Sequence, residues 1–350
     1  MADHMSGIRP LRTGVIGASG FAGAELLRIA AGHPGLDVVF ASSESLTGVA
    51  VGDKFPGLAR SYPTLALQPW ASIPSHLDAV FVALPHGVSQ SVIPKLNAGI
   101  VIDLGSDFRF DDPLTYEAWY GETHSATELM SQFAYGMVEL RREAIAGTTA
   151  IAVPGCYVTA ATLTLAPLLA AGVVEPEGIV VDAASGVTGA GRDPKPSTTF
   201  TAVSEDFTAY GLLNHRHTGE MEHALSQSAG TAVELLFTPH LAPMNRGILA
   251  TCYLKPTGNQ TTDDLLQVMG DFYEGEIFIQ VSDKIPHTKA TLGSNSVHMT
   301  VRRDQRTDWV VAIGALDNLV KGAAGQAVQC LNVACDFPEN TGLESAGVYS

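Results

Sequence analysis

The sequence predicts an α/β protein of two domains, one with a doubly wound parallel sheet and one of α+β type with a mostly antiparallel sheet. The chain has 350 residues, enough for two domains with full cores. Hydrophobic residues make up 46% of it and charged residues only 16%, which argues against disorder. Short apolar runs alternate with helical segments up to about residue 150, and longer strand-like runs follow. This change in the length and spacing of the apolar runs predicts the two kinds of sheet.

The short apolar runs of the first half are typical of buried parallel strands. Strands are predicted over residues 11–16, 36–41, 79–84 and 100–104, and helices over 22–31 and 89–97. An apolar strand then leads into Pro154-Gly155, and a buried helix is predicted over residues 158–174. That helix carries Pro167 and is too short to be a convincing membrane span.

The second half has longer strand-like runs. Strands are predicted over residues 179–184, 232–239, 247–255 and 296–303. A helix over residues 262–273 starts near a Thr/Asp cap. A last helix is predicted over residues 316–333, where glycine and alanine would permit close approach to a cofactor or a sheet.

Charge and cysteine usage narrow the class of function. A formal net charge of −16 weighs against non-specific nucleic-acid binding and against an anionic membrane, because both need a basic surface. The four cysteines are scattered and form no C-x-x-C pair, which favours a reducing cytoplasm over a disulfide framework. Residues 1–10 lack the apolar core of a signal peptide, so we expect no secretion.

A glycine loop of the form G-x-x-G-x-x-G follows the first predicted strand and opens a helix. Glycine suits a sharp turn that brings the backbone close to a pyrophosphate, and the helix N-terminus then supplies N–H donors. An ordinary tight turn is the simpler alternative, but the strand before and the helix after favour a Rossmann-type dinucleotide site. The loop residues expected to bind the cofactor are Gly17, Ser19, Gly20, Phe21 and Ala22.

The end of the second strand bears on the choice of cofactor. Ser42 and Ser43 stand where an acidic residue would usually accept the ribose hydroxyls of NAD. Hydroxyl groups suit the 2′-phosphate of NADP better, so NADP is expected. Glu44 keeps NAD open, and the two serines are alternatively no more than the start of a loop.

Cys156 is the candidate nucleophile. It follows Pro154-Gly155 and precedes the long helical segment, so its thiol is expected at a helix N-terminus, where the dipole favours the thiolate. Taken alone, a free cysteine is more often a small buried hydrophobe. That reading holds for the other three, Cys252, Cys330 and Cys335, which lie in an apolar strand and on or after the last predicted helix.

His215 and His217 form the densest polar group of the second half, together with Arg216. Histidine suits both the activation of a thiol and the protonation of an oxygen. Zinc is the less favoured alternative, with His215, His217 and His223 as ligands beside Cys156 or Glu222, because the chain has no H-E-x-x-H motif. The simplest alternative is a solvated helix start capped by Thr218.

Three arginines are candidate binders of an anionic substrate. Arg109 follows a buried strand at its carboxyl end, where ligands of such sheets bind. Arg192 ends a glycine-rich loop, and Arg246 lies beside a strand. For Arg109 the alternative is a surface ion pair with Asp107 or Asp111, and the loop that ends at Arg192 is alternatively only a mobile connection.

Together these segments resemble the N-acetyl-γ-glutamyl-phosphate reductase family over nearly the whole chain. The matching motifs, in the family's order, are Gly17-Ala18-Ser19-Gly20, Ala83-Leu84-Pro85-His86-Gly87, Asp107-Phe108-Arg109, Val153-Pro154-Gly155-Cys156-Tyr157, Ser185-Gly186 with Gly189-Ala190-Gly191-Arg192, His215-Arg216-His217, Arg246-Gly247-Ile248-Leu249-Ala250-Thr251 and Asp317-Asn318-Leu319-Val320-Lys321-Gly322.

The resemblance implies the third reaction of arginine biosynthesis. In it NADPH reduces N-acetyl-glutamyl 5-phosphate to the 5-semialdehyde, with release of phosphate, through a thioester on Cys156. One histidine of the pair is the acid–base, and His217 is favoured. Further cofactor residues implied are Leu84, Pro85, His86, Ser185, Gly186, Gly189 and Asn318, and further substrate residues are Gly155 and Tyr157 beside Arg109, Arg192 and Arg246.

The resemblance also implies how the chain is divided and assembled. Residues 1–153 and 318–350 would form the NADP-binding domain, and residues 154–317 the catalytic and oligomerisation domain. A cytoplasmic homodimer or homotetramer is expected, with the acyl phosphate and inorganic phosphate as ligands and no metal. Where the family usually has proline, this chain has Val138, Val158 and Gly219, which puts the stiffness of three loops in doubt.

Other functions stay open. Aspartate-semialdehyde dehydrogenases share the plan, although the His-Arg-His group favours the acetylglutamyl enzyme. A reductase of carrier-linked aminoadipyl or glutamyl phosphate would need a basic docking face, and the acidic composition of this chain does not indicate one. A non-catalytic, nucleotide-sensing regulator would have no need of Cys156, His217 and Arg109 together.

Overall fold

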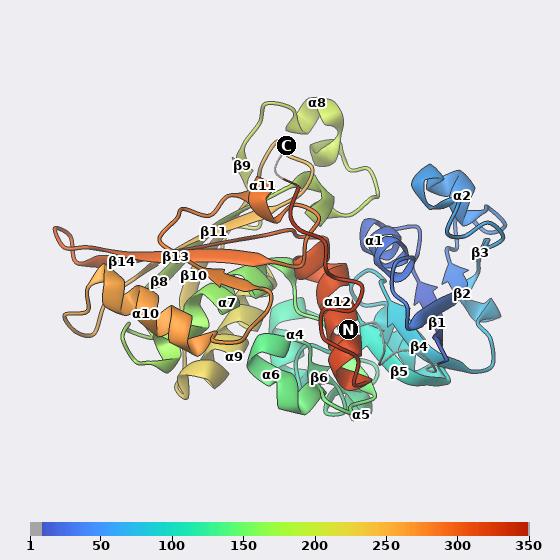
Figure 1. Ribbon diagram of the computed structural model, residues 1–350, viewed down its shortest axis with the longest axis horizontal. Helices are drawn as coiled ribbons and strands as arrows, with labels where there is room; N and C mark the ends of the chain where they lie inside the picture. The colour runs from blue at the N-terminus through green and yellow to red at the C-terminus, as the bar shows by residue number, and fades with distance from the viewer. Residues whose placement is uncertain (1–8, 349–350) are drawn as a thin grey trace. The chain divides into compact units, whose positions relative to one another are not determined.

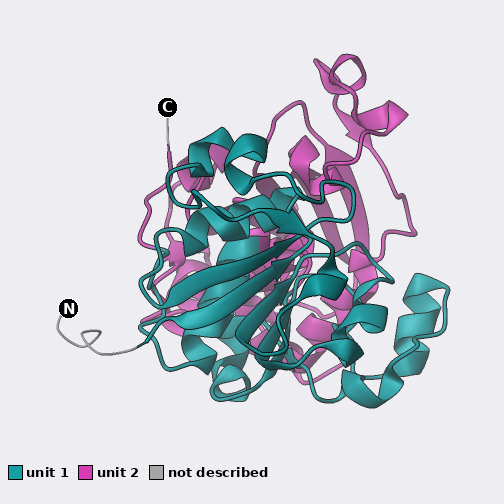
Figure 2. Ribbon diagram, turned by 90° about the vertical axis from the view of Figure 1, so that its right-hand side faces the viewer, with its two compact units in different colours: residues 1–153, 324–343 teal, residues 154–323, 344–350 magenta. Residues whose placement is uncertain are grey.

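The computed structural model describes residues 9–348 and divides the chain into two compact units (Figure 2). Unit 1 comprises Met1–Val153 and Ala324–Leu343, and unit 2 comprises Pro154–Ala323 and Glu344–Ser350. Residues 318–323 and 344–350, which the resemblance assigned to the nucleotide domain, therefore group with unit 2. Residues 1–8, which make up most of the segment expected to lack a signal peptide, lie outside the described residues.

Unit 1 contains a seven-stranded sheet in the order β3-β2-β1-β4-β5-β7-β6, and every neighbouring pair is parallel. The strands are β1 Leu11–Ile16, β2 Leu36–Ser42, β3 Leu67–Gln68, β4 Leu77–Val82, β5 Ala98–Asp103, β6 Ala134–Tyr135 and β7 Ala150–Ala152. The helices are α1 Phe21–Ala30, α2 Val51–Lys54, α3 Ser89–Val92, α4 Pro113–Tyr120, α5 Thr127–Met130, α6 Val138–Ile145 and α12 Gly325–Ala334. The predicted doubly wound parallel sheet is confirmed.

The strand order places a switch point between β1 and β4. The chain leaves β1 towards β2 and β3 on one side and returns to β4 on the other. Loops that follow the carboxyl ends of β1 and β4 are therefore neighbours, and such a point is where sheets of this kind bind dinucleotides. The backbone N–H of Ala83, after β4, donates to the carbonyl of Ile16 at the end of β1, at 2.8 Å.

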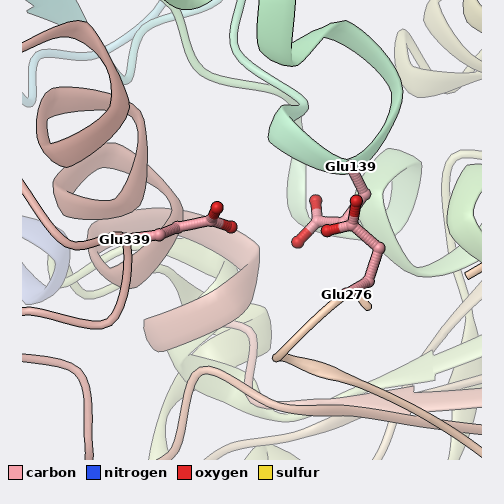
Figure 3. Close-up of side chains that lie close together, drawn as sticks. All are labelled: Glu139, Glu276 and Glu339. Atoms are coloured by element: carbon pink, nitrogen blue, oxygen red, sulfur yellow. The ribbon is translucent and has the colours of Figure 1, made fainter. Parts of the chain in front are cut away.

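Helix α12 completes unit 1 although it lies far along the chain. Its side chains from Gly325 to Asn332 are buried. Nε2 of Gln329 donates to Oε1 of Glu139 on α6, at 2.9 Å, and to Oε1 of Glu339, at 2.7 Å; Figure 3 shows both carboxylates. Glu276, labelled in the same figure, belongs to unit 2. The predicted helix over residues 316–333 is wrong in its first part, because residue 316 ends a strand and a π-helical turn, Val320–Ala324, precedes α12.

Unit 2 contains a second seven-stranded sheet, in the order β12-β13-β14-β11-β8-β10-β9. The pairs β8/β10 and β12/β13 are parallel and the other four are antiparallel, so the expected mostly antiparallel sheet is confirmed. The strands are β8 Ile179–Ser185, β9 Thr208–Ala209, β10 Leu235–Leu241, β11 Ile248–Leu254, β12 Ile279–Val281, β13 Val297–Asp304 and β14 Trp309–Leu316. The helices are α7 Cys156–Ala170, α8 Phe200–Val203, α9 His217–Ala229, α10 Thr262–Phe272 and α11 Thr288–Thr291.

Three helices of unit 2 pack on its sheet: α7 against β11 and β14, α9 against β10, and α10 against β13 (Figure 1). Helix α7 is buried from Tyr157 to Leu169, which explains why it is apolar on all sides. Helix α10 starts where its cap predicts, since Thr261 and Asp264 form a capping box. Over the described residues, no helix has both the length and the apolar character needed to cross a bilayer.

Candidate active site

Cys156 is the first residue of α7, with Gly155 as its N-cap. The apolar strand β7 ends at Ala152, and the extended backbone of Gly155 (φ −65°, ψ 146°) turns the chain into the helix. The thiol is half-buried, and the first N–H groups of α7 lie beside it without intrahelical partners. The expected position of Cys156 at a helix N-terminus is confirmed, and it is one where backbone donors can stabilise an oxyanion.

His217 lies against the residue that precedes the thiol. It is the first residue of α9, and a Cβ built on Gly155 would lie only 2.3 Å from Nε2 of His217. Glycine is therefore required at position 155 to make room for the imidazole. Of the two histidines, His217 is the one that this contact places beside the backbone of the nucleophile.

Glu220 lies one turn further along α9 and holds the backbone of the same residue, Gly155. Its residue is 1% exposed, and its Oε1 accepts a hydrogen bond from the N–H of Gly155 at 2.9 Å. The sequence analysis missed this residue. The available signal was its spacing, because three residues after His217 on a helix is one turn on the same face.

His215 has a different environment. The N–H of His217 donates to its Nδ1 at 3.2 Å, so Nε2 carries the proton of the neutral ring. Burial, and then the charge of Arg216, lower the pKa of His215 from 6.5 to about 4. It stays neutral near pH 7, with one nitrogen already engaged.

Tyr157 and Tyr210 are hydrogen-bonded to each other beside the two histidines. The Tyr210 hydroxyl donates to the Tyr157 hydroxyl at 3.1 Å, and the Tyr157 hydroxyl donates to the carbonyl of His240 at 3.0 Å. The ring of Tyr157 meets the rings of His215 and His217 edge-on, with centroids 5.8 and 6.0 Å away. Tyr210 was not predicted.

The loop after β8 is tied to the start of β11 by Asn318. Its Oδ1 accepts from the N–H of Gly247 at 2.8 Å, and its Nδ2 donates to Oγ1 of Thr188 at 3.0 Å. Ser185 is buried at the start of the loop, and Gly186 is needed there because a Cβ would lie 2.6 Å from backbone atoms of residues 245 and 246. These predicted cofactor residues, with Gly189, belong to unit 2.

Two of the predicted substrate arginines also belong to unit 2. Arg246 donates from Nε and Nη2 to Oδ1 of Asp317, at 3.2 and 3.1 Å. Asp317 is fully buried and also accepts from the N–H of Gly293. This pair, with an acid that sequence reasoning missed, sets the direction of the guanidinium. Arg192 follows the glycine-rich turn and is half-buried.

Unit 1 gathers the other predicted residues at the carboxyl ends of its strands. Gly17 has φ +80°, and a Cβ there would lie 2.2 Å from the carbonyl oxygen of Ala83. Gly20 is the N-cap of α1, whose first turn contains no acidic residue. The helix start therefore has a glycine at its N-cap and no negative charge in its first turn, which suits a pyrophosphate, and the loop fits a dinucleotide. Ser19, Phe21 and Ala22 lie in the same loop and helix start, and Leu84, Pro85 and His86 lie in the loop after β4.

The serines at the end of β2 bond to the glycine loop. Oγ of Ser42 accepts from the N–H of Gly17 at 3.1 Å, and the Ser43 hydroxyl donates to Oγ of Ser19 at 2.9 Å. Oε1 of Glu44 accepts from the N–H of Trp70 at 2.9 Å. The acid that kept NAD open is thus hydrogen-bonded to the segment that follows β3.

The loop after β5 forms a network around His86. Nδ1 of His86 lies 2.6 Å from Oγ of Ser106, and Nε2 lies 3.0 Å from Oε1 of Glu122. Burial raises the pKa of Asp107, but hydrogen bonds from His86 and from the N–H groups of Gly87 and Gln90 outweigh it and hold the pKa below its usual range. Arg109 is buried and donates from Nη2 to the carbonyl of Leu104 at 3.1 Å.

The same strand end carries a buried acid that was not predicted. Asp103 has no exposed surface, and burial raises its pKa to about 7 against the hydrogen bonds from Gly105 and Ser89.

The geometry gives no support to the zinc alternative. Among the described residues, the ring nitrogens of His215, His217 and His223 do not gather with a Cys156 or Glu222 ligand atom. Nε2 of His223 lies instead 2.8 Å from Nε2 of Gln227, four residues further along α9. Thr218 does not cap α9 either, since the N-cap position is Arg216 and no side chain bonds there.

The three positions at which the family usually has proline lie in helices and not in loops. Val138 is the first residue of α6, and Val158 and Gly219 are the third residues of α7 and α9. N–H groups of a first turn have no intrahelical acceptor, so either proline or another residue fits there. The three positions are therefore helix starts, and their effect on stiffness near the site stays a prediction.

Comparisons with known proteins agree with this arrangement. Residues 12–148 match the family described as semialdehyde dehydrogenase, NAD binding domain, and residues 156–318 match semialdehyde dehydrogenase, dimerisation domain. An aspartate semialdehyde dehydrogenase II from Vibrio cholerae, complexed with ASA, has a TM-score of 0.70 at 18% identity and covers 93% of this chain and 98% of that one. An aspartate semialdehyde dehydrogenase with NADP from Candida albicans has a TM-score of 0.66 at 12% identity, with 92% and 98% covered.

The fold and the thiol at a helix start therefore define an oxidoreductase of the semialdehyde dehydrogenase class. Among relatives, the N-acetyl-gamma-glutamyl-phosphate reductase of Symbiobacterium thermophilum is 45% identical, with 96% of this chain and 98% of that one covered. The protein of the same name from Rhodospirillum rubrum is 42% identical, with 96% and 97% covered. The chain belongs to the N-acetyl-γ-glutamyl-phosphate reductase family.

Proposed function

We propose that this chain reduces N-acetyl-γ-glutamyl phosphate to the γ-semialdehyde, with release of inorganic phosphate, as a step of arginine biosynthesis. The observation that carries the proposal is the corner formed by Cys156, Gly155 and His217, in a chain 41–45% identical to relatives of that name. The cofactor is NADP(H), which suits the glycine loop and the hydroxyl groups of Ser42 and Ser43.

The thiolate of Cys156 attacks the γ-carbonyl carbon. A C–S bond forms, and the bond to the phosphate oxygen then breaks to leave a thioester and inorganic phosphate. The N–H groups of the first turn of α7 stabilise the oxyanion of each tetrahedral intermediate. When bound, NADPH supplies the hydride that reduces the thioester. The reduction leaves a thiohemiacetal oxyanion, to which His217, as the imidazolium, donates a proton. His217 takes that proton back as the C–S bond breaks, which releases the aldehyde and restores the thiolate.

Three arginines are proposed to bind the anionic groups of the substrate. Arg246 has a fixed direction because Asp317 holds it, and Arg109 and Arg192 are the other candidates. Glu220 positions Gly155 and hence the helix start.

The chain is proposed to act in the cytoplasm as a homo-oligomer. A free thiol nucleophile needs a reducing compartment, and the segment that carries Cys156 matches a domain described by its role in dimerisation. A homodimer or a homotetramer is expected.

The experiment is a panel of aldehydes run in the oxidative direction, with phosphate and NADP⁺, in which NADPH formation is followed by absorbance. N-acetylglutamate semialdehyde should give the highest kcat/KM, and omission of phosphate should abolish the signal. Cys156→Ser should fold normally and lose nearly all turnover, because a hydroxyl is a far weaker nucleophile. A higher kcat/KM for aspartate semialdehyde would overturn the proposal.

A further inference from the structure

Residues 196–213 of unit 2, here called the arm, expose an unusual amount of apolar side chain. Phe200, Phe207, Leu212 and Leu213 are each between 60% and 83% exposed. Single exposed apolar residues are ordinary, but a concentration of large ones in one segment marks an interaction surface. Figures 1 and 2 both show α8, within the arm, projecting from the rest of unit 2.

The arm has little structure of its own to hold it. Its helix α8 has four residues, and β9 has two residues that pair with β10 at the edge of the sheet. Two non-glycine residues, Glu205 and Leu213, have φ of 64° and 62°. Such backbone strain persists when surrounding contacts impose it, and most of the arm's large side chains face outwards.

A cavity of about 580 Å³ lies between the arm and the segment before β11. The arm lines it with Thr198, Phe200, Val203, Ser204 and Glu205, and the rest of its lining is Val187, Pro243, Met244 and Asn245. A two-fold axis close to this cavity would let exposed side chains of the arm of one copy, such as Leu212, enter the cavity of the other. Self-complementary patches of this kind form isologous interfaces.

Charge narrows the choice of partner. Between residues 196 and 213 the chain has two acids, Glu205 and Asp206, and neither lysine nor arginine. With a net charge of −16 on the whole chain, this surface repels nucleic acid and anionic membranes. The arm lies inside residues 156–318, the segment that matches a dimerisation domain.

We propose that a second copy of this chain covers the arm, and that this contact supports the active site. The inference rests on the homo-oligomer of the proposed function and assigns a surface to it. The claim that this contact supports the active site follows from a series of contacts at the base of the arm. Phe207 stacks on His240 with ring centroids 5.2 Å apart, and the His240 carbonyl accepts from the Tyr157 hydroxyl, next to Cys156.

Tyr210, also in the arm, donates to the same Tyr157 hydroxyl. A partner that buries Phe207 therefore fixes both groups that hold the tip of Tyr157. Tyr157 and Tyr210 act as positioning residues that depend on assembly.

The test compares Phe200→Ser/Leu212→Ser with the wild type by sedimentation over a range of protein concentrations. The double variant should raise the dissociation constant between copies by about tenfold or more, since both changes remove buried apolar contact from one interface. Its kcat should fall at low protein concentration and recover at high concentration. Leu114→Ser, which changes a leucine that is 74% exposed on α4 of unit 1, is the matched control and should change neither quantity.

The conservative variant Phe200→Leu/Leu212→Met should assemble like the wild type, which separates lost burial from misfolding. A double serine variant that sediments like the wild type at every concentration overturns the interface. A dissociated variant with full kcat overturns the link to the active site. If the wild type assembles through the arm but reduces no acyl phosphate, the proposed function fails and the interface stands.

Discussion

His215 and His217 lie two residues apart, yet their imidazoles have different environments. His215 accepts an N–H at Nδ1, and burial keeps it neutral near pH 7. His217 contacts the backbone directly before the thiol. We expect His217→Asn to lower kcat by about two to four orders of magnitude, the range for a lost proton-transfer group. His215→Asn should cost less, and steady-state kinetics of both variants would reverse the assignment if it costs more.

The depressed pKa of His215 also predicts a pH dependence of stability. The folded group titrates at about 4 and the unfolded group at 6.5, so between these values only the unfolded state binds the proton. The stability from neutral His215 is complete above pH 6.5 and falls as pH drops towards 4, by about 3 kcal/mol at most. Urea unfolding of the wild type and His215→Asn from pH 7.5 to 4 should show a difference that shrinks in this window. A constant difference would contradict it.

The comparison between variants is needed because Asp103 titrates in the opposite sense. Its folded pKa of about 7 lies above the unfolded value of 3.8, so its contribution grows as pH falls through 7. The difference between wild type and variant cancels this effect, since both contain Asp103.

The cofactor preference depends on two residues that follow β2, Ser43 and Glu44. Ser43 bonds to Ser19, and the carboxylate of Glu44 accepts from the N–H of Trp70. We expect a higher kcat/KM with NADPH than with NADH. Ser43→Asp should move the preference towards NADH, because a carboxylate repels the 2′-phosphate and accepts a hydroxyl. Ser45→Asp, an exposed change two residues on, is the control, and an NADH preference of the wild type would refute the reading.

Residues whose signal is local could be predicted from the sequence, and residues defined by distant partners could not. Cys156 and the glycine loop are marked by the turn before a helix, which neighbouring residues determine. Glu220 is a partner of Gly155, which lies 65 positions earlier, and Asp317 holds Arg246 across 71 positions. The spacing from His217 places Glu220 on the same helix face, but no neighbouring residue identifies the distant partner of either acid.

At the scale of elements, the hydrogen bond between Glu220 of α9 and Gly155, the N-cap of α7, holds the two helix starts of the candidate active site together. Glu220→Ala leaves the buried N–H of Gly155 without its acceptor, which costs about 1–3 kcal/mol of unfolding free energy. We also expect kcat to fall, because the helix start and His217 lose their common anchor. Glu220→Gln keeps an oxygen acceptor and should retain most of both quantities.

Glu222 offers a control from the same helix. Its Oε1 accepts from the N–H of Leu235 at 3.1 Å, away from the thiol. Glu222→Ala should lower stability and leave kcat nearly unchanged. Equal losses of kcat in the two alanine variants, from kinetics and denaturant melts together, would show that Glu220 acts through stability alone.

Elements with a long, regular pattern were predicted, and those decided by tertiary contacts were missed. The four longest strands of the parallel sheet and α10 have clear apolar runs or caps, whereas the two-residue strands β3 and β6 were not predicted. Strand β14 was not predicted, because its small residues Ala312, Gly314 and Ala315 give no clear strand pattern, and the predicted last helix began at its final residue, Leu316. Its partners β11 and β13 decide the matter, and Gly314 is needed because a Cβ there would lie 2.1 Å from Oγ1 of Thr164 on α7.

At the scale of the whole molecule, unit 1 is built from two segments that lie far apart in the sequence. Unit 1 is interrupted by some 170 residues of unit 2 before α12 completes it. Nε2 of His33 lies 2.9 Å from Oδ1 of Asn332 on that helix, and Nε2 of Gln326 donates to the carbonyl of Gly136 at 2.8 Å. Val328 and Leu331 of α12 have no exposed surface. The dinucleotide sheet therefore has no complete core until nearly the whole chain is available.

A chain ending at residue 323 should consequently fail to bind NADPH, although its glycine loop and all seven strands of the parallel sheet are present. Loss of α12 exposes the apolar surface it covers and leaves buried polar groups such as His33 and the Gly136 carbonyl without partners. A chain ending at residue 343 keeps all of unit 1 and is the matched control, and it should bind NADPH. Titration followed by the fluorescence of NADPH, with circular dichroism to record folding, measures the difference. Binding by the shorter chain with the affinity of the longer one would show that the first 153 residues fold without their last helix.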